Sequence, residues 1–516
     1  MADSIAVGAR PVEQPGQPRL AAGAIGLAGQ LFQSITHMAP AAGVIFSAQY
    51  MASKGGGSLT LAWIIATVAC LLTALCLKEV VGKVRSAGGY FVIHSVALGH
   101  FVGFTTSWLW FLFEPLVPAA LSMLFGQVLS DFVLAETGVL IPWWLVAIVM
   151  VGILTYTSYV GIKQSSRTTV IMGSLEIGIL LVLALVWIVK AGPNQPVISL
   201  LPASSPLGWG GVFFATVYGI LSFLGFEAGV PLAEESKNAK RSLTISIIAS
   251  TIGIGLFYCL MGYATVAAWG GFDNPQGFAD DFGAAANPYI TMGQNALGIL
   301  GALLVLFVIA NSSFACSVAG QNAVTRVYYS LGRAGVFPKW LFHINAKTQT
   351  PDRAIFMQAG ISLFFALVCG FLFGPLIGYG LLGLLFTVAL MIVYIMTNVS
   401  CFALYFFKYR EEFKVWSHLV IPVLATIAML APLAAALIPD LIFGPDNANV
   451  YPITLGLPIT VIWFVIGIGF YAWLRVKRPA QLDMMANEMA TVDLVGEDAD
   501  PRARATAEAP AAFTTS

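Results

Sequence analysis

The chain has 516 residues, of which 58% are hydrophobic and only 10% are charged. This composition excludes an ordinary soluble domain and predicts a membrane protein that crosses the bilayer many times. Lys and Arg together number 25, as do Asp and Glu, so the net charge indicates no class of partner. The sequence has no basic cluster interleaved with aromatic residues, and we expect no nucleic acid partner.

The two ends of the sequence differ from its centre. The first residues are rich in Pro, Gly and Gln and lack the apolar run of a signal peptide. From about Pro479 the chain is polar and rich in Ala, Glu and Asp. We expect flexible cytoplasmic tails over residues 1–24 and 479–516, with a transmembrane domain over residues 25–478.

Apolar stretches of about 20 residues, the length that crosses a ~30 Å hydrocarbon core as a helix, recur along the chain. They predict an all-α protein with twelve transmembrane helices. Asn287 and Pro288 predict a further short helix before the eighth span. The twelve predicted spans are residues 30–52, 59–81, 101–130, 142–161, 168–190, 211–234, 242–269, 297–325, 354–374, 378–407, 418–439 and 452–475.

Basic residues in the loops predict the orientation in the membrane. They follow the even-numbered spans, whereas the loops after odd-numbered spans hold only Lys54 and Lys190 and are rich in Asp. Because Lys and Arg in short loops mark the cytoplasmic side, we expect both termini in the cytoplasm. The expected location is the cell membrane, with membrane lipid as a partner.

The first and sixth spans contain helix-breaking residues at mid-depth. Pro40 and Gly43 interrupt the first, and Gly225 and Pro231 interrupt the sixth. Backbone groups freed at this depth are tolerated only where they line a cavity. Equivalent breaks in two halves predict a 5+5 inverted repeat, about residues 30–190 and 211–407, around a midplane substrate site. The helices at 418–439 and 452–475 lie outside the repeat.

The two breaks predict a site for a molecule with a carboxylate and an ammonium group. Free amides at the positive end of a half-helix suit the carboxylate, and carbonyls of the unwound stretches suit the ammonium. Small residues also pack helices in membranes, and the sequence leaves this alternative open. The predicted substrate-binding residues are Ala39, Pro40, Ala41, Ala42, Gly43, Ser222, Phe223, Leu224, Gly225, Phe226 and Glu227.

Three carboxylates lie within predicted spans, where a charge costs on the order of 2.5–3.5 kcal/mol and therefore needs a reason. Glu176 in the fifth span suits a group that carries a coupling proton, or one that bonds neighbouring hydroxyls. Glu114 precedes Pro115, and we interpret it first as a partner for the backbone freed by that proline and second as a partner for an amine substrate. Glu227 lies in the break of the sixth span, where the alternative role is to cap the broken helix.

Other polar and aromatic side chains within the spans are candidates for coupling or gating. Ser312 and Ser313 suit a sodium site or plain bonds between helices. His37 titrates near neutrality and suits proton transfer or a packed neutral role. Aromatic residues of the third and sixth spans suit an aromatic wall and gate, although the two tryptophans equally suit the membrane interface: Trp108, Trp110, Phe113, Phe223 and Phe226.

Three stretches of the chain resemble the amino acid–polyamine–organocation (APC) superfamily. Ala41–Phe46 resembles its small-residue break in helix one, Ser222–Glu227 with Ala233–Arg241 resembles its GFE…EExxNPKR run, and Arg326–Pro338 resembles its loop after helix eight. The resemblance covers about residues 25–475. It implies a LeuT-type fold with discontinuous helices 1 and 6, an amino acid permease activity, and a role for the glutamate of the GFE run in substrate binding or gating.

These features favour a secondary active transporter for an amino acid that works by alternating access. Proton symport is the preferred coupling because buried acids are present; sodium is the alternative ion. A polyamine or small-amine transporter is the alternative substrate class. The sequence lacks channel filter repeats, metal or nucleophile–base clusters and a phosphate-binding GxxxxGK[ST] motif, so we expect no enzyme activity, cofactor or metal. The oligomeric state stays open.

Overall fold

The computed structural model describes residues 20–84, 88–333, 335–439 and 453–479. Within these residues the chain is helical and forms no β-strand, with a single isolated bridge between Ile25 and Ser236. The tails expected at both ends lie outside the described residues, apart from residues 20–24 and 479.

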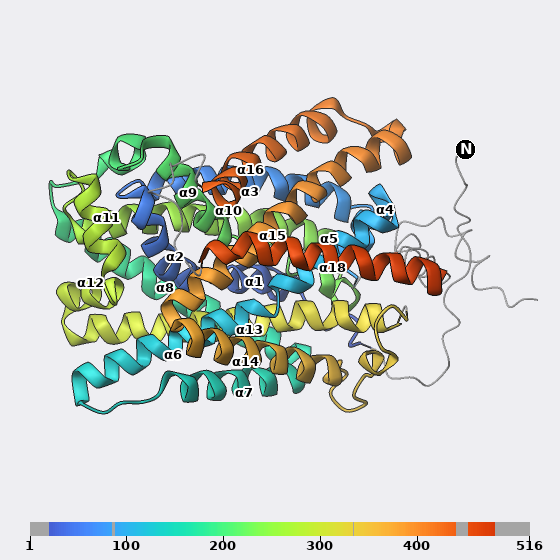
Figure 1. Cartoon of the computed structure of the whole chain (residues 1–516), viewed down its shortest axis with the longest axis horizontal. Coiled ribbons are helices and arrows are strands. Elements are labelled where there is room, and N and C mark those ends of the chain that lie inside the picture. Colours follow the sequence, from blue (N-terminus) through green and yellow to red (C-terminus); the bar gives the residue numbers. More distant parts are fainter. Residues whose placement is uncertain (1–19, 85–87, 334, 440–452, 480–516) are drawn as a thin grey trace, which may run out of the picture.

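Figure 1 shows the arrangement of the helices along the chain. The first half contains α1 (Leu27–His37), α2 (Pro40–Gly55), α3 (Leu59–Val81), α4 (Tyr90–Leu98), α5 (His100–Phe113), α6 (Leu116–Thr137), α7 (Trp143–Tyr159) and α8 (Ile162–Ala191). The second half contains α9 (Gly208–Leu221), the 3₁₀ helix η3 (Val230–Glu235), α10 (Ala239–Trp269), α11 (Pro275–Ala284), α12 (Pro288–Leu297), α13 (Ile299–Arg333), α14 (Asp352–Phe373), α15 (Pro375–Ala403), α16 (Ile421–Leu437) and α18 (Gly456–Lys477).

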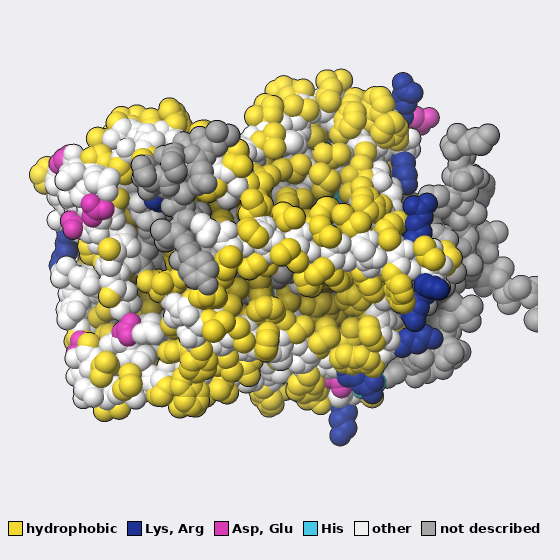
Figure 2. All heavy atoms as spheres, in the orientation of Figure 1, with side chains coloured by type: hydrophobic (Ala, Val, Ile, Leu, Met, Phe, Trp, Pro, Cys, Tyr) yellow, Lys and Arg dark blue, Asp and Glu magenta, His cyan; other side chains and the backbone are white. Residues whose placement is uncertain are grey.

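Nine helical stretches of the described residues are long and apolar enough to cross a bilayer. The other three predicted spans correspond to the interrupted pair α1 and α2, to α7, and to α9 with η3. Figure 2 shows hydrophobic side chains over the middle of the molecule, with Lys and Arg gathered at one end and Asp and Glu mostly at the other. We call these the basic end and the acidic end. The structure is that of a multi-pass membrane protein.

The first predicted span is interrupted where the sequence places the break. α1 ends at His37, and α2 begins at Pro40. Ala39 between them has φ +50°, a left-handed conformation that costs a non-glycine residue about 1–3 kcal/mol. Such a residue persists only where its surroundings hold it, so the break is fixed by contacts with other helices.

The sixth predicted span is interrupted over a longer stretch. α9 ends at Leu221, residues 222–229 form successive turns, and η3 begins at Val230. Gly225 has φ +114°, which a side chain would oppose. A β-carbon there would also lie 2.2 Å from the ring of His37, so the glycine lets the two breaks approach one another.

Some elements differ from the prediction. The third span is divided at Glu114 and Pro115 into α5 and α6, because proline removes a backbone donor. The short helix expected at Pro288 is present as α12. Two further short helices, α4 and α11, were not predicted, because each is shorter than a membrane span.

Candidate functional site

Tyr258 of α10 holds the two breaks together. Its hydroxyl lies 2.5 Å from the carbonyl oxygen of Met38 and 2.7 Å from that of Ser222. The Ser222 hydroxyl in turn lies 3.0 Å from the carbonyl oxygen of Gly43, as a donor. Carbonyls freed by the two interruptions therefore meet around one buried tyrosine, which sequence reasoning missed. A tyrosine in the middle of an apolar span was the available signal.

Gly43 is required by this contact. A β-carbon at this position would lie 2.7 Å from the Tyr258 hydroxyl and 3.1 Å from the carbonyl oxygen of Met38. Any side chain would therefore push Tyr258 away from the break. The small residue predicted at this position therefore allows Tyr258 of α10 to lie against the main chain of the break.

The N-terminus of α2 is occupied by groups of the chain itself. The Ala42 amide donates to the Ser312 hydroxyl at 3.0 Å, and that hydroxyl donates to Glu176 Oε1 at 3.3 Å. Asn311 Nδ2 donates to Glu176 Oε2 at 2.9 Å. The structure thus brings together two residues that the sequence proposed separately, Glu176 and Ser312. It also gives the Ala42 amide, expected to bind a substrate carboxylate, a partner within the chain.

Ser313 does not join this relay. Its hydroxyl is buried and has no hydrogen-bond partner among the described residues. No group of three or more His, Cys, Asp or Glu residues in the described part of the chain is placed to hold a metal ion.

His37 and Glu114 form a second buried polar pair beside the break. His37 Nε2 lies 3.3 Å from Glu114 Oε1, and both side chains are 2% exposed. His37 Nδ1 lies 3.3 Å from the carbonyl oxygen of Cys316. A carbonyl only accepts, so Nδ1 is the donor in this contact, and Nε2 faces the Glu114 carboxylate. Glu227 lies near this pair, and its Oε2 accepts from the Tyr394 hydroxyl at 3.0 Å.

The structure separates the residues of the predicted aromatic wall. Trp110 and Phe113 pack edge to face with ring centroids 5.8 Å apart. Trp108 points elsewhere and stacks on Trp463 of α18, with centroids 4.7 Å apart. The two phenylalanines of the sixth-span break are buried against different tyrosines, with Phe223 on Tyr258 and Phe226 on Tyr394.

A different aromatic cluster lies beyond the break toward the acidic end. Tyr50 of α2 stacks on Tyr218 of α9 with centroids 5.0 Å apart. Tyr379 of α15 lies 6.0 Å from Tyr50 and 5.5 Å from Phe46 by ring centroids. This cluster joins both interrupted spans to α15. Sequence reasoning missed it because its members come from three distant segments.

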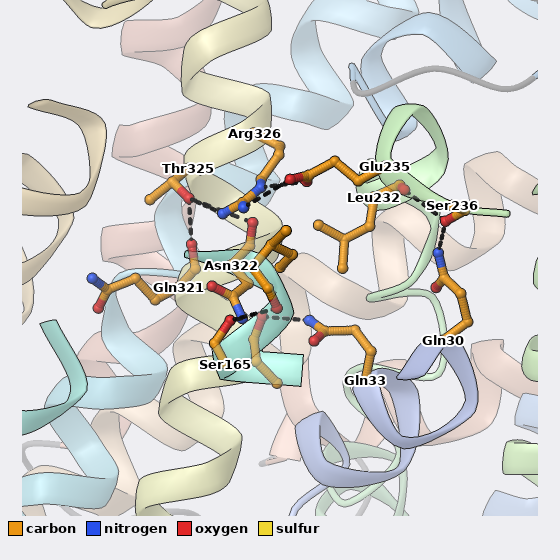
Figure 3. Close-up of polar contacts among 12 residues, drawn as sticks. Gln30, Gln33, Ser165, Leu232, Glu235, Ser236, Gln321, Asn322, Thr325 and Arg326 are labelled. Atoms are coloured by element: carbon orange, nitrogen blue, oxygen red, sulfur yellow. Dashed lines mark hydrogen bonds and ion pairs between the residues drawn. The ribbon is translucent and has the colours of Figure 1, made fainter. Parts of the chain in front are cut away.

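Polar side chains join four segments on the other side of the break (Figure 3). Arg326 of α13 donates to both carboxylate oxygens of Glu235, at 2.9 and 3.3 Å. Gln30 of α1 donates to the Ser236 hydroxyl, and Asn322 donates to the Ser165 hydroxyl at 3.0 Å. Together they hold the α1 half-helix near α13, α8 and η3. We call these residues, with Gln33, the basic-end cluster: Gln30, Gln33, Ser165, Glu235, Ser236, Asn322 and Arg326.

Two interrupted spans that meet within a helical membrane protein are an arrangement found in many secondary transporters. Residues 25–473 match the amino acid permease family. The chain therefore belongs to this family and, with it, to the APC superfamily. This places it among transporters rather than enzymes.

Three relatives show what the chain is similar to. The branched-chain amino acid permease BcaP of Bacillus subtilis (strain 168) is 28% identical over 323 residues, which cover 58% of this chain and 65% of that protein. Cationic amino acid transporter 1 of Arabidopsis thaliana is 24% identical, covering 60% and 52%. The low-affinity putrescine importer PlaP of Escherichia coli (strain K12) is 24% identical, covering 60% and 66%. The chain thus spans about half to two thirds of the length of these relatives.

Proposed function

We propose that this protein is a secondary active transporter that moves an amino acid across the cell membrane by alternating access. The observation that carries the proposal is the meeting of two interrupted spans at Tyr258. Carbonyls of Met38 and Ser222 are polar groups deep in the bilayer, and they suit the ammonium group of a small substrate. Gly43 leaves room for the Tyr258 hydroxyl beside the main chain at this point.

The proposed topology has twelve spans in a 5+5 inverted repeat, with the basic end in the cytoplasm. The nine long helices and the three shorter or interrupted ones support the count. The gathering of Lys and Arg at one end supports the orientation. Each half of the proposed repeat opens with an interrupted span, α1 with α2 and α9 with η3.

The proposed coupling ion is a proton carried by Glu176. This side chain has no exposed surface and reaches the start of α2 through the Ser312 hydroxyl. A change in its protonation therefore changes the hydrogen bonds at the Ala42 amide, beside the substrate site. Sodium held by serine oxygens of α13 is the alternative ion.

A polyamine or small amine is the second candidate substrate. It is favoured by the relay at the α2 N-terminus, because Ser312 and Glu176 already occupy the end of the half-helix dipole that would attract a substrate carboxylate. A substrate without a carboxylate does not compete with these groups.

The test is uptake by the purified full chain in proteoliposomes. A thermal-shift screen against amino acids and amines selects ligands, and each is then measured as labelled substrate with and without an inward proton gradient. We expect saturable uptake that the proton gradient stimulates and a protonophore abolishes, with no requirement for sodium. Absence of uptake for every amino acid and amine under every gradient, from monodisperse protein, would refute the proposal.

A further inference from the structure

A small cavity adjoins His37 and Glu114 on the side of the breaks that faces the basic-end cluster. It extends to Val327, the neighbour of Arg326, and its walls come from α1, α4, α5, the turns after α9, and α13. The centre of a water-sized group can move within about 10 Å³ of it. That is room for one water molecule or one ammonium group.

Four polar atoms in the lining residues have no hydrogen-bond partner among the described residues. They are Glu114 Oε2, the Tyr90 and Ser107 hydroxyls, and Trp110 Nε1. The four side chains are between 2% and 7% exposed. Buried polar groups are almost always bonded, and each one left without a partner costs about 1–3 kcal/mol. Four at one cavity indicate that a molecule other than the chain itself, a ligand or water, bonds these atoms.

The chemistry of the lining favours a cation. Two carboxylates, Glu114 and Glu227, line the cavity together with one imidazole, that of His37, which pairs with Glu114, and no Lys or Arg does. Glu114 Oε2 and the hydroxyls of Tyr90 and Ser107 are three acceptors, which matches the three N–H donors of a protonated primary amine. The rings of Tyr90 and Trp110 add aromatic surface that attracts an ammonium group.

His37 positions Glu114 for this role. It contacts Oε1, whereas Oε2 has no hydrogen-bond partner among the described residues. The imidazole of His37 packs closely against Gly320 of α13. A β-carbon added at this glycine would lie 2.5 Å from His37 Cε1 and 3.2 Å from Glu114 Oε2. The carboxylate therefore presents one oxygen in a fixed direction.

We propose that this cavity binds the protonated amino group at the end of a substrate's alkyl chain, and that the protein therefore prefers diamines or amino acids with a charged side-chain amine. This inference rests on the proposed transport function and narrows its substrate class. The ammonium group passes from the main-chain carbonyls at the breaks to Glu114 as the substrate moves toward the basic end.

The test compares matched probes that differ only in a terminal ammonium group. Lysine is paired with norleucine, and 1,4-diaminobutane with butylamine, in equilibrium binding to the purified full chain. We expect at least tenfold tighter binding of the ammonium member in at least one pair. The Glu114→Gln substitution should reduce that ratio at least fivefold, because a neutral amide replaces the carboxylate that faces the ammonium.

A pair of hydroxyl substitutions on α5 provides the matched control. Ser107→Ala removes an acceptor of the cavity and should reduce the ratio two- to fivefold. Thr105→Ala removes a hydroxyl that is bonded within its own helix, to the carbonyl oxygens of Phe101 and Val102, and should leave the ratio unchanged. If Glu114→Gln does not give monodisperse protein, the comparison of Ser107→Ala with Thr105→Ala decides whether the cavity binds an ammonium group.

Two outcomes would overturn the inference. In the first, ammonium and methyl probes bind equally well to the unaltered protein. In the second, Ser107→Ala and Thr105→Ala have the same effect, which indicates that the cavity holds only water. Proton-driven uptake of neutral amino acids together with either outcome would leave the proposed function intact. Absence of uptake for all probes would instead remove the proposed function.

Discussion

Arg326 and Glu235 form an ion pair in which neither side chain has any exposed surface. The neighbouring residue, Glu234, pairs with Arg333 at 3.1 Å, but these side chains remain 17% and 23% exposed. Two adjacent glutamates of η3 thus bind two arginines of α13 in different surroundings. Because the two pairs differ in burial, we expect the loss of each pair to change the free energy of unfolding by a different amount.

Glu235→Gln should destabilise the protein strongly, by about 3–5 kcal/mol, because it leaves the Arg326 charge buried without a counter-charge. Glu234→Gln should cost at most about 1 kcal/mol, since the partly exposed Arg333 is solvated. Thermal unfolding of the two purified variants in detergent measures both effects. Equal shifts in Tm would show that Arg326 reaches water in a conformation other than this one.

Gly43→Val should reduce uptake to less than a tenth of the unaltered level without preventing membrane insertion. The added side chain displaces Tyr258, whose hydroxyl would lie within 2.7 Å of the new β-carbon. Gly253→Val on α10 is the control, because a β-carbon there meets nothing within 4 Å. Uptake in proteoliposomes, normalised to inserted protein, is the measurement. Normal uptake by Gly43→Val would exclude the break as the substrate site.

Tyr258→Phe should lower uptake about tenfold while preserving the packing of the ring. The substitution removes the hydroxyl that links the carbonyls of Met38 and Ser222, and a buried acceptor without its donor costs about 1–3 kcal/mol. The stacking of the ring on Trp63 is retained. Initial rates and binding should fall together. A variant with unchanged rates would show that Tyr258 does not fix the breaks.

Glu176→Gln should leave substrate exchange but abolish accumulation driven by a proton gradient. Glutamine keeps one acceptor oxygen for Asn311 and can donate from its amide nitrogen to the Ser312 hydroxyl, but it cannot gain or lose a proton. Counterflow in the absence of a gradient measures exchange, and uptake against a concentration difference measures coupling. Accumulation at the level of the unaltered protein would exclude Glu176 as the coupling group.

The two tryptophans of α5 should respond differently to substitution. Trp108→Leu should lower Tm without changing the substrate concentration at half-maximal uptake, because this ring packs on α18. Trp110→Leu should raise that concentration, because Trp110 lines the cavity beside Glu114. A comparison of uptake kinetics with Tm separates the roles. Opposite results would place Trp108 rather than Trp110 near the substrate path.

The interruptions of the first and sixth spans were predictable because their causes are local. Pro40 cannot continue a helix, and Gly225 adopts a backbone conformation that disfavours a side chain. The three intramembrane glutamates were likewise visible in the sequence, because a charge in an apolar span is expensive whatever surrounds it.

The partners of these residues were not predictable. α5 carries large aromatic side chains around most of its circumference, so its sequence does not indicate that Trp108 faces α18 while Trp110 faces the cavity. The contact of Tyr258 with Met38 joins residues 220 positions apart. α4 was missed because its nine residues are too few for a span, although it supplies Tyr90 to the cavity. Such contacts depend on tertiary packing, which no periodicity encodes.

Trp108 and Trp463 also exchange hydrogen bonds, since each indole N–H donates to the other's carbonyl oxygen, at 2.8 and 2.7 Å. Because two reciprocal bonds and a stacked ring pair join α18 to α5, we expect a displacement of one helix to carry the other. A fluorophore attached at Val476, which is 76% exposed at the far end of α18, would therefore follow the travel of an interior helix during turnover. A largely exposed helix would thus report optically on the proposed movement of a buried one.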